Sequence, residues 1–318
     1  MSDGATPAPT VEEPALAPVP RHPRRVVFLG TPEMAVPPLR ALAAAGFDVV
    51  AVVTRVDKRR GRGGELSPSP VKAAAVELGL DVAHRVDDVL DLDADLGVVV
   101  AFGQIIKPHV LARLPMVNLH FSLLPRWRGA APVERALLAG DTETGVCVMQ
   151  VEHGLDTGGV FARAVVPIGR RATAVELRAE LVAVGTGLLT STLAQGLGEP
   201  EAQTGDPTYA AKIDPAELRV VWRSPADRID RLVRVGGAWT TFRGRRLKIV
   251  DAEPAAGPVE DPGAATTGAH APGTISGAAV ACADGALVLR IVQPEGKPAM
   301  AAAAWANGAR LAPGERFD

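Results

Sequence analysis

Short valine-rich apolar runs alternate with helical segments between residues 25 and 151. The runs include VVFLG, VVAVVT and LGVVVAFG, and the segments between them include PPLRALAAAG and PVKAAAVELG. Continuous apolar strands separated by helices are typical of a parallel sheet that is covered on both faces. The pattern predicts an open α/β domain, in which ligands bind beyond the carboxyl ends of the strands. The positions expected at these ends are Gly30, Phe102, Gly103, the residues after Leu119 and the loop after Val151.

The character of the sequence changes near residue 198, where the segment GEPEAQTGDPT follows a helical pattern over residues 173–197. Beyond this segment, short strand-like runs are separated by Gly and Pro turns, which is typical of a small β domain such as a barrel. The first 23 residues are rich in Pro and Ala and lack apolar periodicity, so they bury too little surface to offset ordering entropy. We therefore predict a disordered extension (1–23), an α/β domain (24–198), a linker (199–207) and a β domain (208–318).

Composition excludes several classes of function. The formal net charge of the 318 residues is −2, so any contact with nucleic acid must come from local basic clusters. The only cysteines, Cys147 and Cys282, are too few for a disulfide framework or a metal cluster. The sequence has no apolar run of the roughly 18 residues that a membrane span needs. We expect a cytoplasmic, monomeric protein with no metal and no membrane partner.

The stretch NLHFSLLPRWRGAAP places an amide, an imidazole and a hydroxyl at alternate positions, in Asn118, His120 and Ser122. Alternate side chains of a strand share a face, so these groups can point the same way. An amide donates N–H groups to a developing oxyanion, and a histidine can take a proton from an amine at neutral pH. The combination indicates acyl-type transfer. A structural histidine, with Asn and Ser capping the next turn, is the alternative interpretation.

A carboxylate that could orient His120 is present in VEHGLDTGG, where Asp156 follows the apolar run 146–151. The glycines that would let this loop fold back closely are Gly154, Gly158 and Gly159. An Asp flanked by glycines also suits a simple turn, and His153 in the same loop is a competing base. The sequence has no serine nucleophile elbow and no cysteine in a reactive context, so we predict direct transfer without a covalent intermediate.

Residues 118–160 resemble, nearly residue for residue, the signature of the formyltetrahydrofolate-dependent formyltransferases. Similar segments are VVFLGTPEMAVPPLRAL, GRGGELSPSPVKAAA, VVVAFGQIIKPHVL, TYAAKIDPAEL and APGTI, so the resemblance extends from residue 24 to the C-terminus. It implies a Rossmann-like parallel-sheet catalytic domain joined to a small OB-like β-barrel. It also implies catalytic roles for Asn118, His120 and Asp156 and 10-formyltetrahydrofolate as the formyl donor, with no metal.

The resemblance also places the folate, because the segment SLLP lines the folate site in that family. The residues expected to bind the cosubstrate are Ser122, Leu123, Leu124, Pro125, Phe102, Gly103 and Ile105. For Phe102, Ile105 and Leu123, packing in the core is an equally good interpretation. Phe121 departs from the family pattern, since a small residue is expected beside His120.

A basic segment, TRVDKRRGRGGELSPSP, predicts a long, positively charged loop. In the family such a loop meets the acceptor end of initiator tRNA, and here the residues expected at the RNA are Lys58, Arg59, Arg60 and Arg62. A second basic cluster lies between Lys212 and Lys248, and Arg126 and Arg128 could reach the RNA or the folate tail, or form structural ion pairs. Together with the β-barrel, the loop favours initiator methionyl-tRNA as acceptor over a UDP-aminosugar or another small amine.

Overall fold

The structure is a computed structural model, and it describes residues 13–60, 64–255 and 270–318. Contacts between residues group the chain into two compact units. The first comprises Met1–Arg128, Val146–Ala164 and Val182–Pro207, and the second comprises Gly129–Gly145, Val165–Leu181 and Thr208–Asp318. Two segments of the predicted α/β domain, Gly129–Gly145 and Val165–Leu181, therefore belong to the same unit as the C-terminal residues.

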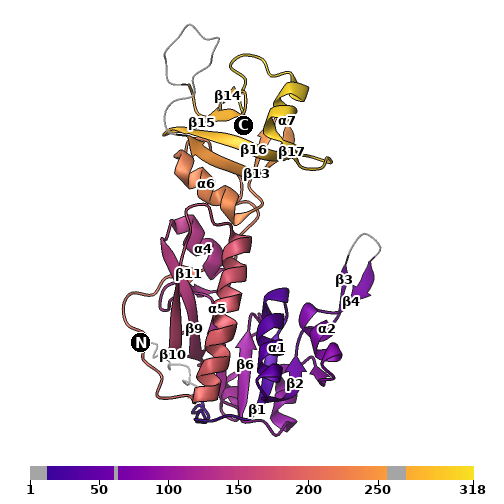
Figure 1. Cartoon of the computed structure of the whole chain (residues 1–318), viewed down its shortest axis with the longest axis vertical. Coiled ribbons are helices and arrows are strands. Elements are labelled where there is room, and N and C mark those ends of the chain that lie inside the picture. The colour runs from indigo at the N-terminus through magenta and orange to yellow at the C-terminus, as the bar shows by residue number, and fades with distance from the viewer. Residues whose placement is uncertain (1–12, 61–63, 256–269) are drawn as a thin grey trace, which may run out of the picture. The chain divides into compact units, whose positions relative to one another are not determined.

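A seven-stranded sheet runs through the first unit (Figure 1). In spatial order its strands are β10 (Val160–Pro167), β9 (Glu143–Gln150), β7 (Met116–His120), β6 (Leu96–Val100), β1 (Arg25–Gly30), β2 (Asp48–Val53) and β5 (Val82–Ala83). From β7 to β5 all neighbouring strands are parallel. The central strands β6 and β1 are buried on both faces, which explains their unbroken apolar sequences.

Strand β9 departs from the parallel prediction. It runs antiparallel to β7, with Val117 opposite Gln150 and His120 opposite Cys147. The loop after Val151 consequently begins beside the amino end of β7, where the N–H of Val151 donates to the carbonyl of Met116 at 2.8 Å. The predicted parallel direction is wrong because a buried apolar run carries no information about strand direction. The loop nevertheless returns to the carboxyl end of β7, where Asp156 lies 3.6 Å from His120.

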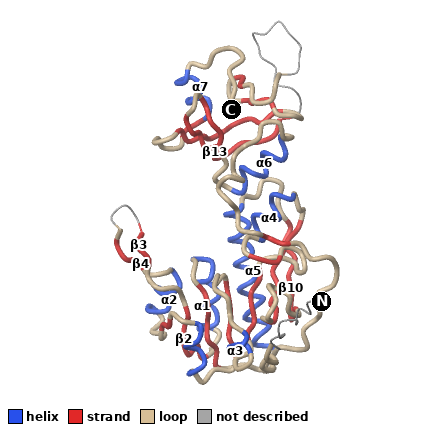
Figure 2. The backbone as a smooth tube through the Cα atoms, turned by 180° about the vertical axis from the view of Figure 1, so that it is seen from behind, coloured by secondary structure: helices blue, strands red, loops and turns tan. Residues whose placement is uncertain are grey.

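The helices of the first unit are α1 (Val36–Ala44), α2 (Pro70–Glu77), α3 (Pro108–Leu111) and the part of α5 (Ala174–Gln195) that follows Val182. Ser69 caps α2, since its hydroxyl accepts the N–H of Lys72 at 3.0 Å, and Pro70 follows at the first helical position. Helix α5 approaches the sheet at Gly185, where an added Cβ would lie 3.2 Å from the side chain of Leu119. Figure 2 shows α5 and α1 along the sheet strands from behind. Helix α5 thereby covers the strand that carries the candidate catalytic residues.

Residues 13–23 are ordered against the first unit, which contradicts the predicted disorder for this part of the extension. Leu16 packs against a buried cluster of the first unit, and the N–H of Ala17 donates to the carbonyl of Leu111 at 2.9 Å. The carbonyl of Arg21 accepts the N–H of Leu197 at 2.7 Å, and Pro23 is buried. A segment held by backbone bonds to a preformed surface needs no periodicity of its own. Residues 1–12 lie outside the described residues.

The second unit contains an antiparallel sheet. Its strands are β12 (Trp239–Phe242), β13 (Arg245–Ala255), β16 (Ala286–Pro294), β15 (Ala279–Ala281) and β14 (Ile275–Ser276), with β17 (Met300–Ala301) paired to β16. The helices of this unit are α4 (Pro132–Ala139), the part of α5 up to Leu181, α6 (Ala226–Val235) and α7 (Ala302–Ala309). Phe317 joins the core by stacking on Trp222 and Trp305, with ring centroids 5.2 and 5.7 Å away. The predicted fold class, an α/β domain with a smaller antiparallel β domain, is confirmed.

No helix in the part of the chain that the structure describes is long and apolar enough to cross a membrane.

An ion pair within the second unit predicts a pH dependence of stability. Arg135 of α4 donates to both carboxylate oxygens of Glu217, at 2.7 and 3.0 Å, and this bond is the main reason why the pKa of Glu217 falls from 4.5 to about 2. A lowered folded pKa stabilises the fold above pH 4.5, and this stabilisation is lost as the pH falls towards about 2. Because the Glu217 side chain is 42% exposed, we expect Glu217→Gln to cost no more than about 1 kcal/mol of unfolding free energy at pH 7.

Urea unfolding of wild type and Glu217→Gln at pH 7 and at pH 2.5 measures this effect, with the exposed Glu180→Gln as control. The difference between wild type and variant should shrink at the lower pH. A difference that is equal at both pH values would show that the ion pair is not its source.

Candidate active site

Three polar side chains of the first unit converge where β7 passes the loop at residues 151–159. The amide nitrogen of Asn118 lies 3.5 Å from one carboxylate oxygen of Asp156, and Nδ1 of His120 lies 3.6 Å from the other. His120 and Asp156 are 5% and 13% exposed, so the carboxylate and the imidazole face each other in a site of restricted water access. Asn118 and His120 share a face of β7, as the alternation of the sequence predicts.

The loop that carries Asp156 is held tightly. Asp156 itself has a φ of +51°, in the left-handed region that Asp tolerates better than most residues. A Cβ at Gly158 would lie 2.1 Å from the carbonyl oxygen of Gln150, and one at Gly159 would lie 2.8 Å from Pro200. Glycine is therefore required at Gly158, and the predicted close return of the loop is confirmed.

The tautomer of His120 is set by the backbone. Nε2 of His120 lies 2.9 Å from the carbonyl oxygen of Trp127, which can only accept a hydrogen bond. In the neutral ring the proton therefore belongs on Nε2, and the lone pair is on Nδ1, facing Asp156. The carbonyl of Trp127 therefore fixes the tautomer, which leaves Nδ1 able to take a proton.

Ser122 supports the turn that presents this carbonyl. Strand β7 ends at His120, so Ser122 lies beyond the alternating face, and its buried hydroxyl donates to the carbonyl of Arg126 at 2.6 Å. Trp127 has a φ of +63°, a conformation that needs such support in a non-glycine residue. Ser122 thus stabilises the turn beside His120, and its buried hydroxyl is engaged in this hydrogen bond.

The residues expected at the folate divide into buried and accessible groups. Phe102, 2% exposed, and Leu124, 3% exposed, belong to hydrophobic clusters, so their side chains pack in the core. Ile105 is 88% exposed, and Leu123 and Pro125 are partly exposed. The carbonyl of Gly103 accepts from Arg55 at 2.8 Å. Phe121, the departure from the family pattern, is 5% exposed and therefore faces away from solvent.

The basic loop contains a short hairpin, formed by β3 (Lys58–Arg60) and β4 (Glu65–Ser67). The side chains of Lys58 and Arg59 are exposed, and Arg59 also donates to the carbonyl of Gly64 at 3.1 Å. Of Arg60 only the backbone is described, and Arg62 lies outside the described residues. At the base of the hairpin, Nζ of Lys72 binds both carboxylate oxygens of Asp57, at 2.9 and 2.8 Å. Because Asp57 is paired with Lys72, it does not neutralise the basic side chains of the hairpin.

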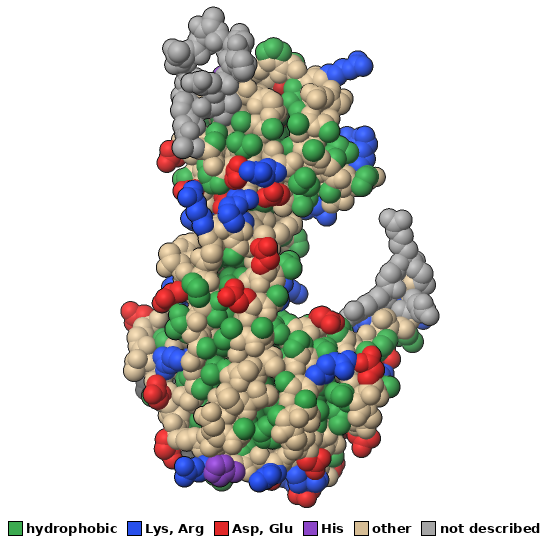
Figure 3. Space-filling model, viewed as in Figure 1, with side chains coloured by type: hydrophobic (Ala, Val, Ile, Leu, Met, Phe, Trp, Pro, Cys, Tyr) green, Lys and Arg blue, Asp and Glu red, His purple; other side chains and the backbone are tan. Residues whose placement is uncertain are grey.

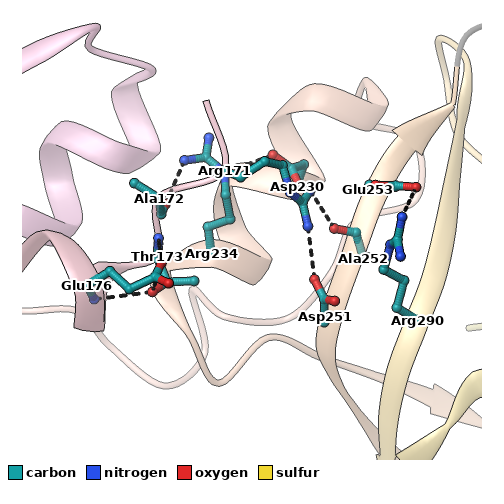
Figure 4. A network of polar contacts seen from close by, with 10 residues as sticks. All are labelled: Arg171, Ala172, Thr173, Glu176, Asp230, Arg234, Asp251, Ala252, Glu253 and Arg290. Atoms are coloured by element: carbon teal, nitrogen blue, oxygen red, sulfur yellow. Dashed lines mark hydrogen bonds and ion pairs between the residues drawn. The ribbon is translucent and has the colours of Figure 1, made fainter. Parts of the chain in front are cut away.

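The second basic cluster is partly neutralised within the second unit. Arg234, a member of the cluster, binds Asp230 at 2.8 Å, and Arg171, which lies outside the cluster, binds Asp230 and Asp251 at 3.0 and 2.9 Å, as Figure 4 shows. Residues of this network line a cleft of about 390 Å³ within the unit. On the face drawn in Figure 3, basic and acidic side chains are interspersed. The arginines drawn in Figure 4 are therefore parts of ion-pair networks and do not form a continuous cationic track.

Trp239, in β12, makes cation–π contacts with two arginines. Cζ of Arg246 lies 4.3 Å and Cζ of Arg219 lies 5.6 Å from its ring centroid. Trp222 is buried in the core of the second unit.

Two residues, Gln203 and Arg128, support the site in a way that the sequence analysis does not predict. The side-chain amide of Gln203 donates to the carbonyls of Asp156 and Gly158, both at 2.8 Å. Arg128 donates to Oε1 of Gln203 from Nε at 3.0 Å and from Nη2 at 2.7 Å, so its guanidinium binds this amide. Gln203 lies in the predicted linker, 47 residues from Asp156, and no spacing could connect them.

No group of three His, Cys, Asp or Glu side chains in residues 13–60, 64–255 and 270–318 is arranged to hold a metal ion.

Two family models match most of the chain. Residues 24–193 match the protein family described as formyl transferase, and residues 212–310 match that described as formyl transferase, C-terminal domain. A protein of Jannaschia sp. (strain CCS1) named methionyl-tRNA formyltransferase is 45% identical over 308 residues, covering 91% of this chain and 98% of that protein. One of the same name from Thermobifida fusca (strain YX) is 44% identical over 318 residues, covering 92% and 99%.

Solved structures share the fold at low sequence identity. An N-formyltransferase from Helicobacter canadensis, solved with folinic acid and dTDP-3-aminofucose, aligns with a TM-score of 0.65 and 17% identity over 85% of this chain and 99% of that one. HypX from Aquifex aeolicus, solved with tetrahydrofolic acid, aligns with a TM-score of 0.60 and 16% identity over 92% of this chain and 48% of that one. These similarities concern the fold alone.

Proposed function

The chain belongs to the formyl transferase family, and we propose that it transfers the formyl group of 10-formyltetrahydrofolate to the α-amine of initiator methionyl-tRNA. The product is N-formylmethionyl-tRNA, which serves translation initiation. The observation that carries the proposal is full-length similarity: relatives named methionyl-tRNA formyltransferase are 43–45% identical and are covered over 95% or more of their length. We further propose that the protein acts in the cytoplasm as a monomer.

The proposed chemistry is a direct transfer. The amine nitrogen attacks the formyl carbon, and the resulting tetrahedral intermediate carries its negative charge on the former carbonyl oxygen. Asn118 donates its amide N–H to this oxygen. The C–N10 bond of the folate then breaks, N10 takes up a proton, and the products are a formamide and tetrahydrofolate.

His120 is the proposed proton acceptor. Because Nε2 donates to the carbonyl of Trp127, the lone pair on Nδ1 is the one available for the proton of the attacking amine. Asp156, 3.6 Å from Nδ1, stabilises the positive charge that the ring gains during the reaction. Catalytic hydrogen bonds are often long in a protein without its substrate, and we expect this contact to shorten when the substrates bind.

The accessible residues at the carboxyl ends of β6 and β7 would hold the folate. These strands are parallel neighbours, so the segments that follow them lie at the same edge of the sheet. Ile105 offers an exposed apolar side chain, and Leu123 and Pro125 are partly exposed. Apolar walls with a few polar contacts suit the pterin ring. The folate carries the activated carbon, so the chain itself needs to supply positioning, proton transfer and stabilisation of the oxyanion.

A competition assay tests the proposed function. The protein is incubated with a labelled formyl donor, methionyl-tRNA and a UDP-aminosugar, and the label on each acceptor is counted. We expect label on the methionyl-tRNA. Label on the sugar alone would establish the alternative, a folate-dependent formyltransferase for small amines, and would overturn the proposed acceptor.

The exposed basic hairpin predicts a salt dependence of tRNA binding. We propose that Lys58 and Arg59, with Arg60 and Arg62, contact the phosphates of the tRNA. Each phosphate contact contributes about 0.7–0.9 to the slope of log K against log salt, so Lys58→Ala/Arg59→Ala should reduce the slope by about 1 to 2. Filter binding at 50–200 mM salt measures it, with Arg24→Ala, an exposed residue before β1, as control. A slope equal to that of wild type would place the RNA elsewhere.

A further inference from the structure

Asp156 and His120 are connected by a second route, through the backbone and one side-chain amide. In the neutral ring of His120, Nε2 donates to the carbonyl of Trp127, and the two atoms are 2.9 Å apart. The next residue, Arg128, donates twice to Oε1 of Gln203, and Nε2 of Gln203 donates to the carbonyl of Asp156 at 2.8 Å. Together with the contact between the His120 ring and the Asp156 carboxylate, these bonds close a ring of contacts within the first unit.

The orientation of the Gln203 amide follows from its partners. Arginine has only donors, so the atom that faces Arg128 must be the oxygen of the amide. The nitrogen then faces the loop, where it gives one hydrogen to the carbonyl of Asp156 and the other to that of Gly158, each at 2.8 Å. Both amide atoms have partners, and a flipped amide would place donors against Arg128 and an acceptor against two carbonyls.

These two bonds hold the loop at its least favourable backbone position. Asp156 has a φ of +51°, and such a conformation persists only where its surroundings determine it. The bonds from Gln203 bracket Thr157, so they fix the peptide groups on the C-terminal side of the catalytic carboxylate. A shift of the loop would move the carboxylate relative to Nδ1 of His120, and displacements of about 1 Å in a catalytic group can cost 10²-fold in rate.

We propose that Gln203, oriented by Arg128, is a positioning residue that sets the geometry between Asp156 and His120 for formyl transfer. The proposal rests on the proposed function. Gln203 acts through the loop and makes no contact with the reacting atoms, so its removal lowers the rate of the chemical step and leaves the binding of both substrates unchanged. Gln203→Ala removes all four bonds, whereas Gln203→Glu keeps an acceptor for Arg128 and loses the donors to the loop.

Steady-state kinetics of formyl transfer to methionyl-tRNA test the proposal. We expect kcat to fall about 10- to 100-fold in both Gln203→Ala and Gln203→Glu, with each KM within about 2-fold of wild type because neither substrate is touched. The control is Gln195→Ala, an exposed glutamine at the end of α5, which should keep wild-type kinetics. A thermal melt accompanies each variant, and Gln203→Glu, which retains the bond to Arg128, serves if Gln203→Ala does not fold.

A double-mutant cycle separates positioning from a general structural role. If Gln203 acts through Asp156, then Gln203→Ala should lower kcat by no more than about 2-fold further in the Asp156→Ala background. The inference would be overturned if the kcat losses of the two single variants multiplied in the double variant. A wild-type kcat in both Gln203 variants would overturn it too, as would a raised KM with unchanged kcat. The proposed function is tested by the wild type alone: failure of the wild type to formylate methionyl-tRNA overturns the function, whereas active Gln203 variants overturn only the role of Gln203.

Discussion

Asn118→Ala is expected to lower kcat about 10²- to 10³-fold, which corresponds to about 2.7–4 kcal/mol of transition-state stabilisation. The loss follows from the proposed role of the amide, which donates to an oxygen that becomes negative only as the tetrahedral intermediate forms. KM for both substrates should change little, because the bond strengthens in the transition state and not in the ground state. Single-turnover formyl transfer with a labelled donor measures the chemical step directly.

The fold should tolerate this substitution. Asn118 lies inside β7, where its backbone pairs with Met149 of β9 and Val99 of β6, so truncating the side chain leaves the strand in place. Asn118→Asp removes the donor at constant volume and adds a charge next to Asp156, and should be at least as damaging. Asn307→Ala, at an exposed position of α7, is the control. Near-normal kcat in folded Asn118→Ala would remove Asn118 from the mechanism.

The sequence predicts the polar face of β7 correctly because the period of a strand is fixed by its backbone. Asn118 and His120 are two residues apart in one strand, and both face Asp156. The same reasoning fails for Ser122, since the strand ends at His120 and the chain turns, so the hydroxyl binds the carbonyl of Arg126. Periodicity is informative only within the element that produces it.

Two other features of the site could not be predicted from the sequence, for different reasons. The carbonyl of Trp127 fixes the tautomer of His120, and every residue carries a carbonyl, so no residue type marks this role. Gln203 reaches the Asp156 loop across 47 positions, from a segment whose Gly and Pro content indicates only a linker. Contacts of this kind depend on the tertiary path of the chain. The antiparallel direction of β9 could not be predicted either, because the apolar sequence of a buried strand does not depend on the direction of the strand in the sheet.

Gly158→Ala is expected to disable the site without touching a catalytic side chain. The added Cβ would lie 2.1 Å from the carbonyl oxygen of Gln150 and 2.9 Å from its carbonyl carbon, far inside van der Waals contact. Gln150 cannot yield easily, since it ends β9 and its N–H donates to the carbonyl of Gly159 at 2.8 Å. The loop must therefore move, and with it Asp156. We expect kcat to fall about 10²-fold and the unfolding free energy to fall by about 1–3 kcal/mol, as is typical of overpacking.

Circular dichroism and urea unfolding establish how much of Gly158→Ala is folded, and kcat is then referred to the folded fraction. Gly187→Ala is the matched control, because Gly187 lies in α5 with no neighbour within 4 Å of an added Cβ, and replacing a helical glycine should stabilise by about 0.5–1 kcal/mol. Both substitutions add one methyl group, but Gly158→Ala is expected to lower the unfolding free energy and Gly187→Ala to raise it. A Gly158→Ala protein with the stability and kcat of wild type would mean that the loop adapts freely, and the close return of the loop would then not be what positions Asp156 against His120.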